Sequence, residues 1–190
     1  MNVRTEVRKL TLSAMFLALG LLLPLLTGQI QTIGNMLCPM HIPVLLCGLM
    51  CGWQYGLGVG AVLPLLRFLL FGMPPLYPTA IAMTFELATY GFLIGFLYEN
   101  SRWQCIVALY RCMIISMVVG RIVSGIANFI LLTINGTGYT MTAFVTANFI
   151  NSIPGIILQL VLIPALMLAL DRTGLYRFKK KAPPEAEIKA

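Results

Sequence analysis

The chain has 190 residues, of which 59% are hydrophobic and only 10% are charged. Soluble domains carry about 25% charged residues, so this composition excludes an ordinary soluble domain and indicates a protein that crosses a membrane several times. The net charge of +7 does not indicate nucleic-acid binding, because the basic residues gather at both chain ends beside apolar segments, as is typical of cytoplasmic ends of membrane spans.

Six apolar segments follow one another along the chain. Their approximate ranges are 7–26, 41–52, 54–72, 79–98, 105–132 and 143–170. A membrane helix needs roughly 20 apolar residues, so little of the chain is left for a soluble catalytic domain. We predict an all-α bundle of six transmembrane helices over residues 1–172. The basic tail over residues 173–190 is expected to be disordered in the cytoplasm.

The loops between the segments predict the orientation. Residues 27–40, 73–78 and 133–142 form three loops on one side of the membrane, and none of them contains Lys, Arg, Asp or Glu. Basic residues favour the cytoplasmic side. With six spans both termini lie on the same side, so the pattern predicts that the N- and C-termini are cytoplasmic and that these three loops are external.

Few charged side chains fall inside the apolar segments. A charge near the bilayer centre costs at least roughly 2.5–3.5 kcal/mol, so such residues usually pair, line a cavity or serve function. At a rise of 1.5 Å per residue, three of them, Arg67, Glu86 and Arg121, are expected in the outer half of the membrane. Uncharged polar residues of other segments are expected at the same depth. The predicted substrate-binding residues are His41, Arg67, Tyr77, Glu86, Tyr90, Arg121, Asn128, Asn148 and Asn151.

Two interpretations of these residues remain open. In one, Glu86 pairs with Arg67 or Arg121 and the asparagines join helices, so the charges serve only to hold the bundle together. In the other, two arginines facing one glutamate leave a positive charge for an anionic guest, typically a carboxylate. His41, the only histidine, is expected at the rim of such a pocket, because Pro43 suits the first turn of a helix.

Other functions are disfavoured by what the sequence lacks. It contains no phosphate-binding loop and no H-E-x-x-H motif, and it offers no paired acids or nucleophile–base pair inside the membrane. We therefore expect neither an enzyme nor a metal or cofactor site. A channel also fits poorly, since polar residues concentrate in one half of the membrane.

The motifs RKLTLSAMFLALGLLLP, HIPVLL, G-x-x-x-G, P-L-L, GMPP and FELATYG, in that order, resemble the substrate-binding S component of energy-coupling factor (ECF) vitamin transporters. The resemblance covers roughly residues 5–172. It implies a subunit of a bacterial plasma membrane that binds a vitamin externally and delivers it to a transmembrane coupling protein (EcfT-like) driven by two ATPases (EcfA-like). Ala14 and Ala18 match the family's A-x-x-x-A motif, which implies contact with the coupling protein.

The motifs MHIP and FELATYG are similar to those of the PanT branch, which implies pantothenate as the substrate. Its carboxylate would pair with Arg67 or Arg121, and Glu86 and the asparagines would bond its hydroxyl and amide groups. Folate, hydroxymethylpyrimidine and pyridoxine-like compounds remain alternatives. So does a membrane assembly protein without a transport function.

Overall fold

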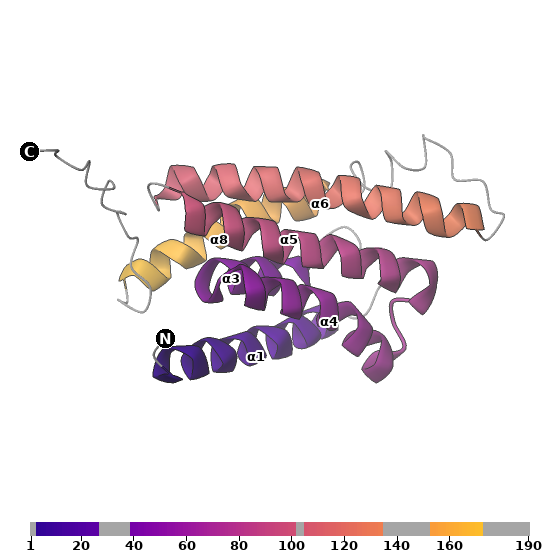
Figure 1. The fold of residues 1–190 in the computed structure, drawn as a ribbon, viewed down its shortest axis with the longest axis horizontal. Coiled ribbons are helices and arrows are strands. Elements are labelled where there is room, and N and C mark those ends of the chain that lie inside the picture. The colour runs from indigo at the N-terminus through magenta and orange to yellow at the C-terminus, as the bar shows by residue number, and fades with distance from the viewer. Residues whose placement is uncertain (1–2, 27–38, 102–104, 135–152, 173–190) are drawn as a thin grey trace, which may run out of the picture.

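The structure is a computed structural model that describes residues 3–26, 39–101, 105–134 and 153–172 (Figure 1). Every regular element in these ranges is helical, which confirms the all-α prediction. The elements are α1 (Val3–Leu26), α3 (His41–Cys51), α4 (Trp53–Phe71), the helical turn η1 (Leu76–Ala80), α5 (Ile81–Asn100), α6 (Ile106–Ile134) and α8 (Ile153–Arg172). The tail over residues 173–190 lies outside the described ranges, so its predicted disorder stays a prediction.

Five helices in the described ranges are long and apolar enough to cross a membrane, namely α1, α4, α5 together with η1, α6 and α8. Large apolar side chains such as Leu69, Leu70 and Val161 are exposed on their outer surfaces. Exposed apolar side chains on several long helices are what a bundle surrounded by lipid requires. The chain is therefore a multi-pass membrane protein.

The short helix α3 lies in the centre of the bundle. Its 11 residues extend about 16 Å, roughly half the thickness of the hydrocarbon core, so α3 by itself does not cross the membrane. All its residues except Met50 are buried, and it contacts α1, α4, α5 and α8. A helix enclosed in this way is apolar on every side. It ends at Gly52, where the backbone has a φ of 102°, a conformation that favours glycine.

The helices alternate in direction, so the bundle has two distinct ends. The end at which α1 begins and α8 finishes is called the N-terminal end, and the opposite end, where α4 finishes and α5 begins, is called the distal end (Figure 1). At the distal end, the predicted loop over 73–78 has non-helical backbone as far as Tyr77, whose φ and ψ are −117° and 133°. The backbone amide of Ala80 donates to the carbonyl of Pro75 and closes the turn that leads into α5.

Glycines bring α4 and α5 into backbone contact. A Cβ atom added at Gly91 of α5 would lie 2.1 Å from the backbone oxygen of Gly56 in α4. A Cβ atom at Gly60 would lie 2.3 Å from the backbone oxygen of Leu87. Small residues spaced four apart allow helices to approach this closely in a membrane. This contact fixes the position of α5 beside α4.

Candidate functional site

Glu86 is a buried carboxylate five residues into α5, near the distal end of the bundle, with a relative exposure of 7%. Tyr90 lies one helical turn further along the same face, and its hydroxyl donates a hydrogen bond of 2.9 Å to Oε1 of Glu86. The pairing follows from helix geometry, because residues four apart are neighbours on a helix surface. The contact between Tyr90 and Glu86 therefore needs no tertiary packing, whereas the predicted substrate-binding role of Tyr90 stays a prediction.

His41 is the second partner of Glu86. Its Nε2 atom lies 3.3 Å from Oε1 of Glu86, and its ring centroid lies 5.1 Å from that of Tyr90. His41 is only 1% exposed, so the expectation that it lies at the rim is wrong. The reason is that α3 starts inside the bundle, against α5, instead of at the membrane surface. The Nδ1 atom of His41 is buried and has no hydrogen-bond partner in the described part of the chain.

Helix α6 supplies a further pair of polar groups. Arg121 and Ser124, three residues apart on α6, are 4% and 3% exposed. Both side chains lie on the part of α6 that packs against Tyr90, which places them near the Glu86 carboxylate. Gly120 leaves room for the ring of Tyr90, because a Cβ atom there would lie 2.2 Å from Cε1 of that ring.

The residues His41, Glu86, Tyr90, Arg121 and Ser124 are called the polar cluster. It gathers side chains from α3, α5 and α6 around one carboxylate. A buried carboxylate is stable in a membrane only when charged or hydrogen-bonding groups surround it. The structure thus supports a pairing role for Glu86, and it brings His41 into ion-pair distance where the sequence had suggested an arginine.

Arg67 lies outside this pairing. It follows Gly60, Leu63 and Pro64, which are all buried, at helical spacings that place it on the inward face of α4. The half-buried guanidinium reaches toward the start of α3, where its Nη1 atom lies 3.1 Å from the sulfur of Met40. Across residues 3–26, 39–101, 105–134 and 153–172, no carboxylate lies within ion-pair distance of Arg67.

Two other predicted residues make contacts elsewhere. The exposed Tyr77 donates a hydrogen bond to the backbone carbonyl of Leu131, which ties η1 to α6. The amide of Asn128 donates to the carbonyl of Ser124, at 3.0 Å, within its own helix. Within the described ranges, neither side chain is seen to bond a side chain of the polar cluster; Asn128 reaches only the backbone carbonyl of Ser124. Asn148 and Asn151 lie outside the described residues.

Sequence reasoning missed three buried residues with possible roles. Ser124 carries a detectable signal, since it lies three residues after Arg121 and so shares its helix face. Gln159 of α8 is 1% exposed and is a lone amide in an apolar segment. Met40 carries no polar signal, and only the fold brings its sulfur to Arg67.

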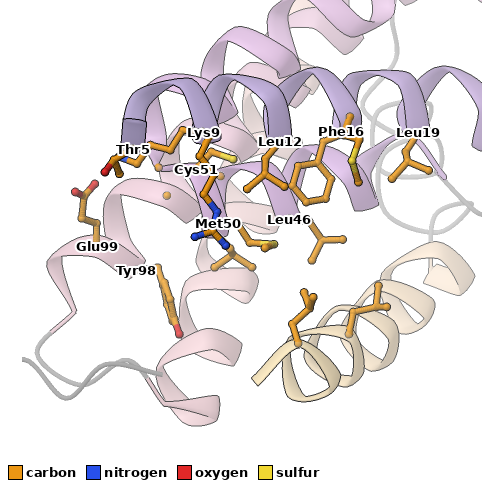
Figure 2. Close-up of a pocket in the computed structure, with 18 of the residues that line it drawn as sticks. Thr5, Lys9, Leu12, Phe16, Leu19, Leu46, Met50, Cys51, Tyr98 and Glu99 are labelled. Atoms are coloured by element: carbon orange, nitrogen blue, oxygen red, sulfur yellow. The ribbon is translucent and has the colours of Figure 1, made fainter. Parts of the chain in front are cut away.

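A large cavity lies in the other half of the molecule. It has a volume of about 950 Å³ and lies between α1, α3, α5 and α8 at the N-terminal end. Figure 2 shows apolar side chains such as Leu12, Phe16 and Leu46 along it, with Lys9 and Glu99 toward one side. No member of the polar cluster lines this cavity, so its walls lack the chemistry expected of the substrate site.

The small residues Ala14 and Ala18 lie on the exposed side of α1. The opposite side of the same helix carries Ser13, Phe16 and Gly20, which are buried against the bundle. The A-x-x-x-A face is thus open in the isolated chain, beside the cavity, whose lining includes Met15 and Leu19 of α1.

The family model of the ECF transporter substrate-specific component matches residues 8–167, from the second turn of α1 into α8. Such components bind a small-molecule substrate and work with the coupling protein EcfT and the EcfA ATPases, and they are not enzymes. No curated protein and no solved structure matches the chain significantly. Because the family match spans nearly the whole bundle, the chain belongs to the substrate-specific components of ECF transporters.

Proposed function

We propose that this chain is the pantothenate-binding subunit of an ECF importer in a bacterial plasma membrane. The observation that carries the proposal is the placement of the polar groups. The polar cluster and the inward-facing Arg67 both lie toward the distal end of a bundle that is otherwise largely apolar. A few convergent polar groups in largely apolar surroundings are typical of small-molecule binding sites.

The chemistry of pantothenate matches these groups. The vitamin has one carboxylate, one amide and two hydroxyl groups. An arginine binds a carboxylate through charge-assisted hydrogen bonds, and the candidate site contains two arginines, Arg67 and Arg121. His41, Ser124 and the carboxylate of Glu86 offer donors and acceptors for hydroxyl and amide groups. Asn128, Asn148 and Asn151 remain predicted contacts of the same kind.

The proposed orientation places both termini in the cytoplasm, which makes the distal end external. It is supported by the basic residues at both ends of the chain and by the uncharged loops between the helices. Substrate would then enter from outside the cell. The EcfA-like ATPases supply the energy, and the EcfT-like protein transmits it to this subunit.

The exposed face of α1 is the proposed contact with the coupling protein. Ala14 and Ala18 are small and exposed, so a partner helix can approach the α1 backbone closely there. The neighbouring cavity between α1 and α8 gives this face a hollow that apolar side chains of the partner can fill.

The test is to identify what the purified protein binds. The protein would be purified gently, without ATP, and its retained small molecules identified by mass spectrometry. Titrations with pantothenate, folate, hydroxymethylpyrimidine and pyridoxine would follow. We expect pantothenate to be retained and to bind in a 1:1 ratio. Retention of another vitamin would change the substrate but not the function.

A membrane assembly protein is the competing function. The observation that favours it is that His41 and Tyr90 contact Glu86 while the charge of Arg121 lies nearby, because buried charges that satisfy one another need no ligand. Under this alternative the protein retains no vitamin and none of the four compounds raises its unfolding temperature. That result would contradict the transport function.

A further inference from the structure

We infer that Arg67, and not Arg121, binds the substrate, and that the site selects substrates with a carboxylate over neutral or cationic ones. The inference rests on the proposed function, since it assumes that the chain binds a vitamin. It goes further by naming the charge of the substrate and the residue that binds its charged group. The sequence leaves the two arginines equivalent, and the structure separates them.

The charge of Arg121 is already engaged. Arg121 is buried on α6 next to Gly120, which packs directly against the ring of Tyr90. Its charge therefore lies close to the Glu86 carboxylate, which His41 also approaches at 3.3 Å. A substrate carboxylate bound to Arg121 would have to compete with Glu86 and would bring two negative charges close together. Like charges in a buried site repel strongly. Arg121 is therefore poorly suited to bind an anion.

The charge of Arg67 is not balanced in the same way. Its guanidinium contacts the thioether sulfur of Met40, which is a weak acceptor and carries no charge. The structure describes no carboxylate near it within residues 3–26, 39–101, 105–134 and 153–172. An arginine that lies on the inward face of a membrane helix, without an acid paired to it, favours an anionic ligand.

Arg67 lies close to the polar cluster in the folded protein. The guanidinium reaches Met40, which directly precedes His41. The Nδ1 atom of His41 is buried, and within the described residues nothing bonds it. A molecule whose carboxylate binds Arg67 would thus have His41 beside it. The inferred substrate class is a carboxylate with a hydroxyl or amide group a few atoms away.

The experiment compares ligands that differ only in the charged group. Pantothenate and panthenol, in which a hydroxymethyl group replaces the carboxylate, would be titrated into the full chain in nanodiscs of fixed lipid composition. The variants are Arg67→Gln and the matched control Arg111→Gln, which removes an exposed arginine of α6 away from the cluster. Because a hydrogen bond to a charged group contributes about 1.5–3 kcal/mol, Arg67→Gln should weaken pantothenate binding roughly 10- to 100-fold.

The inference requires a specific pattern of affinities. The unaltered chain and Arg111→Gln should prefer pantothenate over panthenol, whereas Arg67→Gln should bind both compounds about equally. Panthenol binding that stays the same in all three proteins shows that Arg67→Gln is folded. Arg67→Lys, which keeps the charge, should retain part of the preference. If Arg67→Gln cannot be purified in a folded form, Arg67→Lys replaces it in the comparison. A preference of Arg67→Lys for pantothenate over panthenol that equals the preference of the unaltered chain would count against the two-hydrogen-bond contact of an arginine.

Two results would overturn the inference. In the first, Arg67→Gln binds panthenol normally yet keeps the full preference for pantothenate, which would indicate that Arg67 contacts a lipid headgroup. In the second, the protein retains a neutral or cationic vitamin, which would leave the transport function intact and remove only the inference. Retention of no vitamin at all would instead overturn the proposed function. If another carboxylate vitamin is retained, that vitamin and its amide replace the pantothenate pair.

Discussion

Glu86 shows how a single residue organises the site. Its carboxylate has a tyrosine from its own helix, a histidine from α3 and an arginine from α6 as neighbours. Removing one member of a buried charge pair costs far more than the pair contributes, because the other member is left unsatisfied. Glu86 therefore links the stability of the bundle to the integrity of the candidate site.

We predict that Glu86→Gln destabilises the protein and weakens vitamin binding. The substitution keeps the shape of the side chain but removes the negative charge that His41 and Arg121 face. The cost is about 3 kcal/mol, which corresponds to roughly 6–12 °C in unfolding temperature for a chain of this size. Thermal unfolding of the ligand-free protein would measure it.

The matched control for this prediction is Glu99→Gln. Glu99 lies on the same helix but is exposed at the N-terminal end, so its substitution should leave both the unfolding temperature and the vitamin affinity unchanged. Equal unfolding temperatures for the two variants would show that the negative charge of Glu86 does not stabilise the protein.

At the scale of the elements, the glycine contacts between α4 and α5 position the site. Glu86 and Tyr90 lie on the segment of α5 that follows the α4 backbone at van der Waals distance, near Gly56 and Gly60. Separating these two helices would shift the carboxylate away from His41. Small residues far from any ligand contact are thus expected to affect binding.

We predict opposite effects for two glycine-to-alanine substitutions. Gly91→Ala places a methyl group 2.1 Å from the backbone oxygen of Gly56, so the helices must separate, and both the unfolding temperature and the vitamin affinity should fall. Gly58→Ala meets no atom within 4 Å and should raise stability by about 0.5–1 kcal/mol, because alanine favours helix. A loss of stability in both variants would contradict the close-packing explanation.

The exposed face of α1 is an element with no partner in the isolated chain. We predict that the double substitution Ala14→Leu and Ala18→Leu prevents assembly with the coupling protein and leaves vitamin binding unchanged. Larger side chains on a small-residue face hold a partner helix away from the backbone. Co-purification with a tagged EcfT-like protein would measure assembly. Val118→Leu, on an exposed face of α6, is the control and should assemble normally.

At the scale of the whole molecule, two regions with different chemistry occupy opposite ends of the bundle. The polar cluster lies toward the distal end, and the largely apolar cavity lies at the N-terminal end. Between them, Leu45, Ile94 and Met113 are fully buried. The proposed substrate site and the proposed partner surface are thus far apart, which would allow one subunit to hold a solute at one end and dock at the other.

The sequence by itself was sufficient for the helical class and for most helix ranges. Hydrophobic length sets the number of apolar segments, and the fixed rise of a helix converts residue number into depth. The hydrogen bond between Tyr90 and Glu86 depends only on helix geometry, because both residues lie on one helix. The short length of α3 was also visible before the fold was known.

Only the tertiary structure decided which of these residues meet. Depth does not specify the direction in which a side chain points around its helix axis, and that direction depends on contacts between segments far apart in the chain. The backbone contact of Gly56 with Gly91 and the enclosure of α3 place His41 against Glu86, where rim exposure was expected. The same contacts separate Arg121, which faces Glu86, from Arg67, which faces Met40. Two arginines that the sequence leaves equivalent thereby acquire different neighbours.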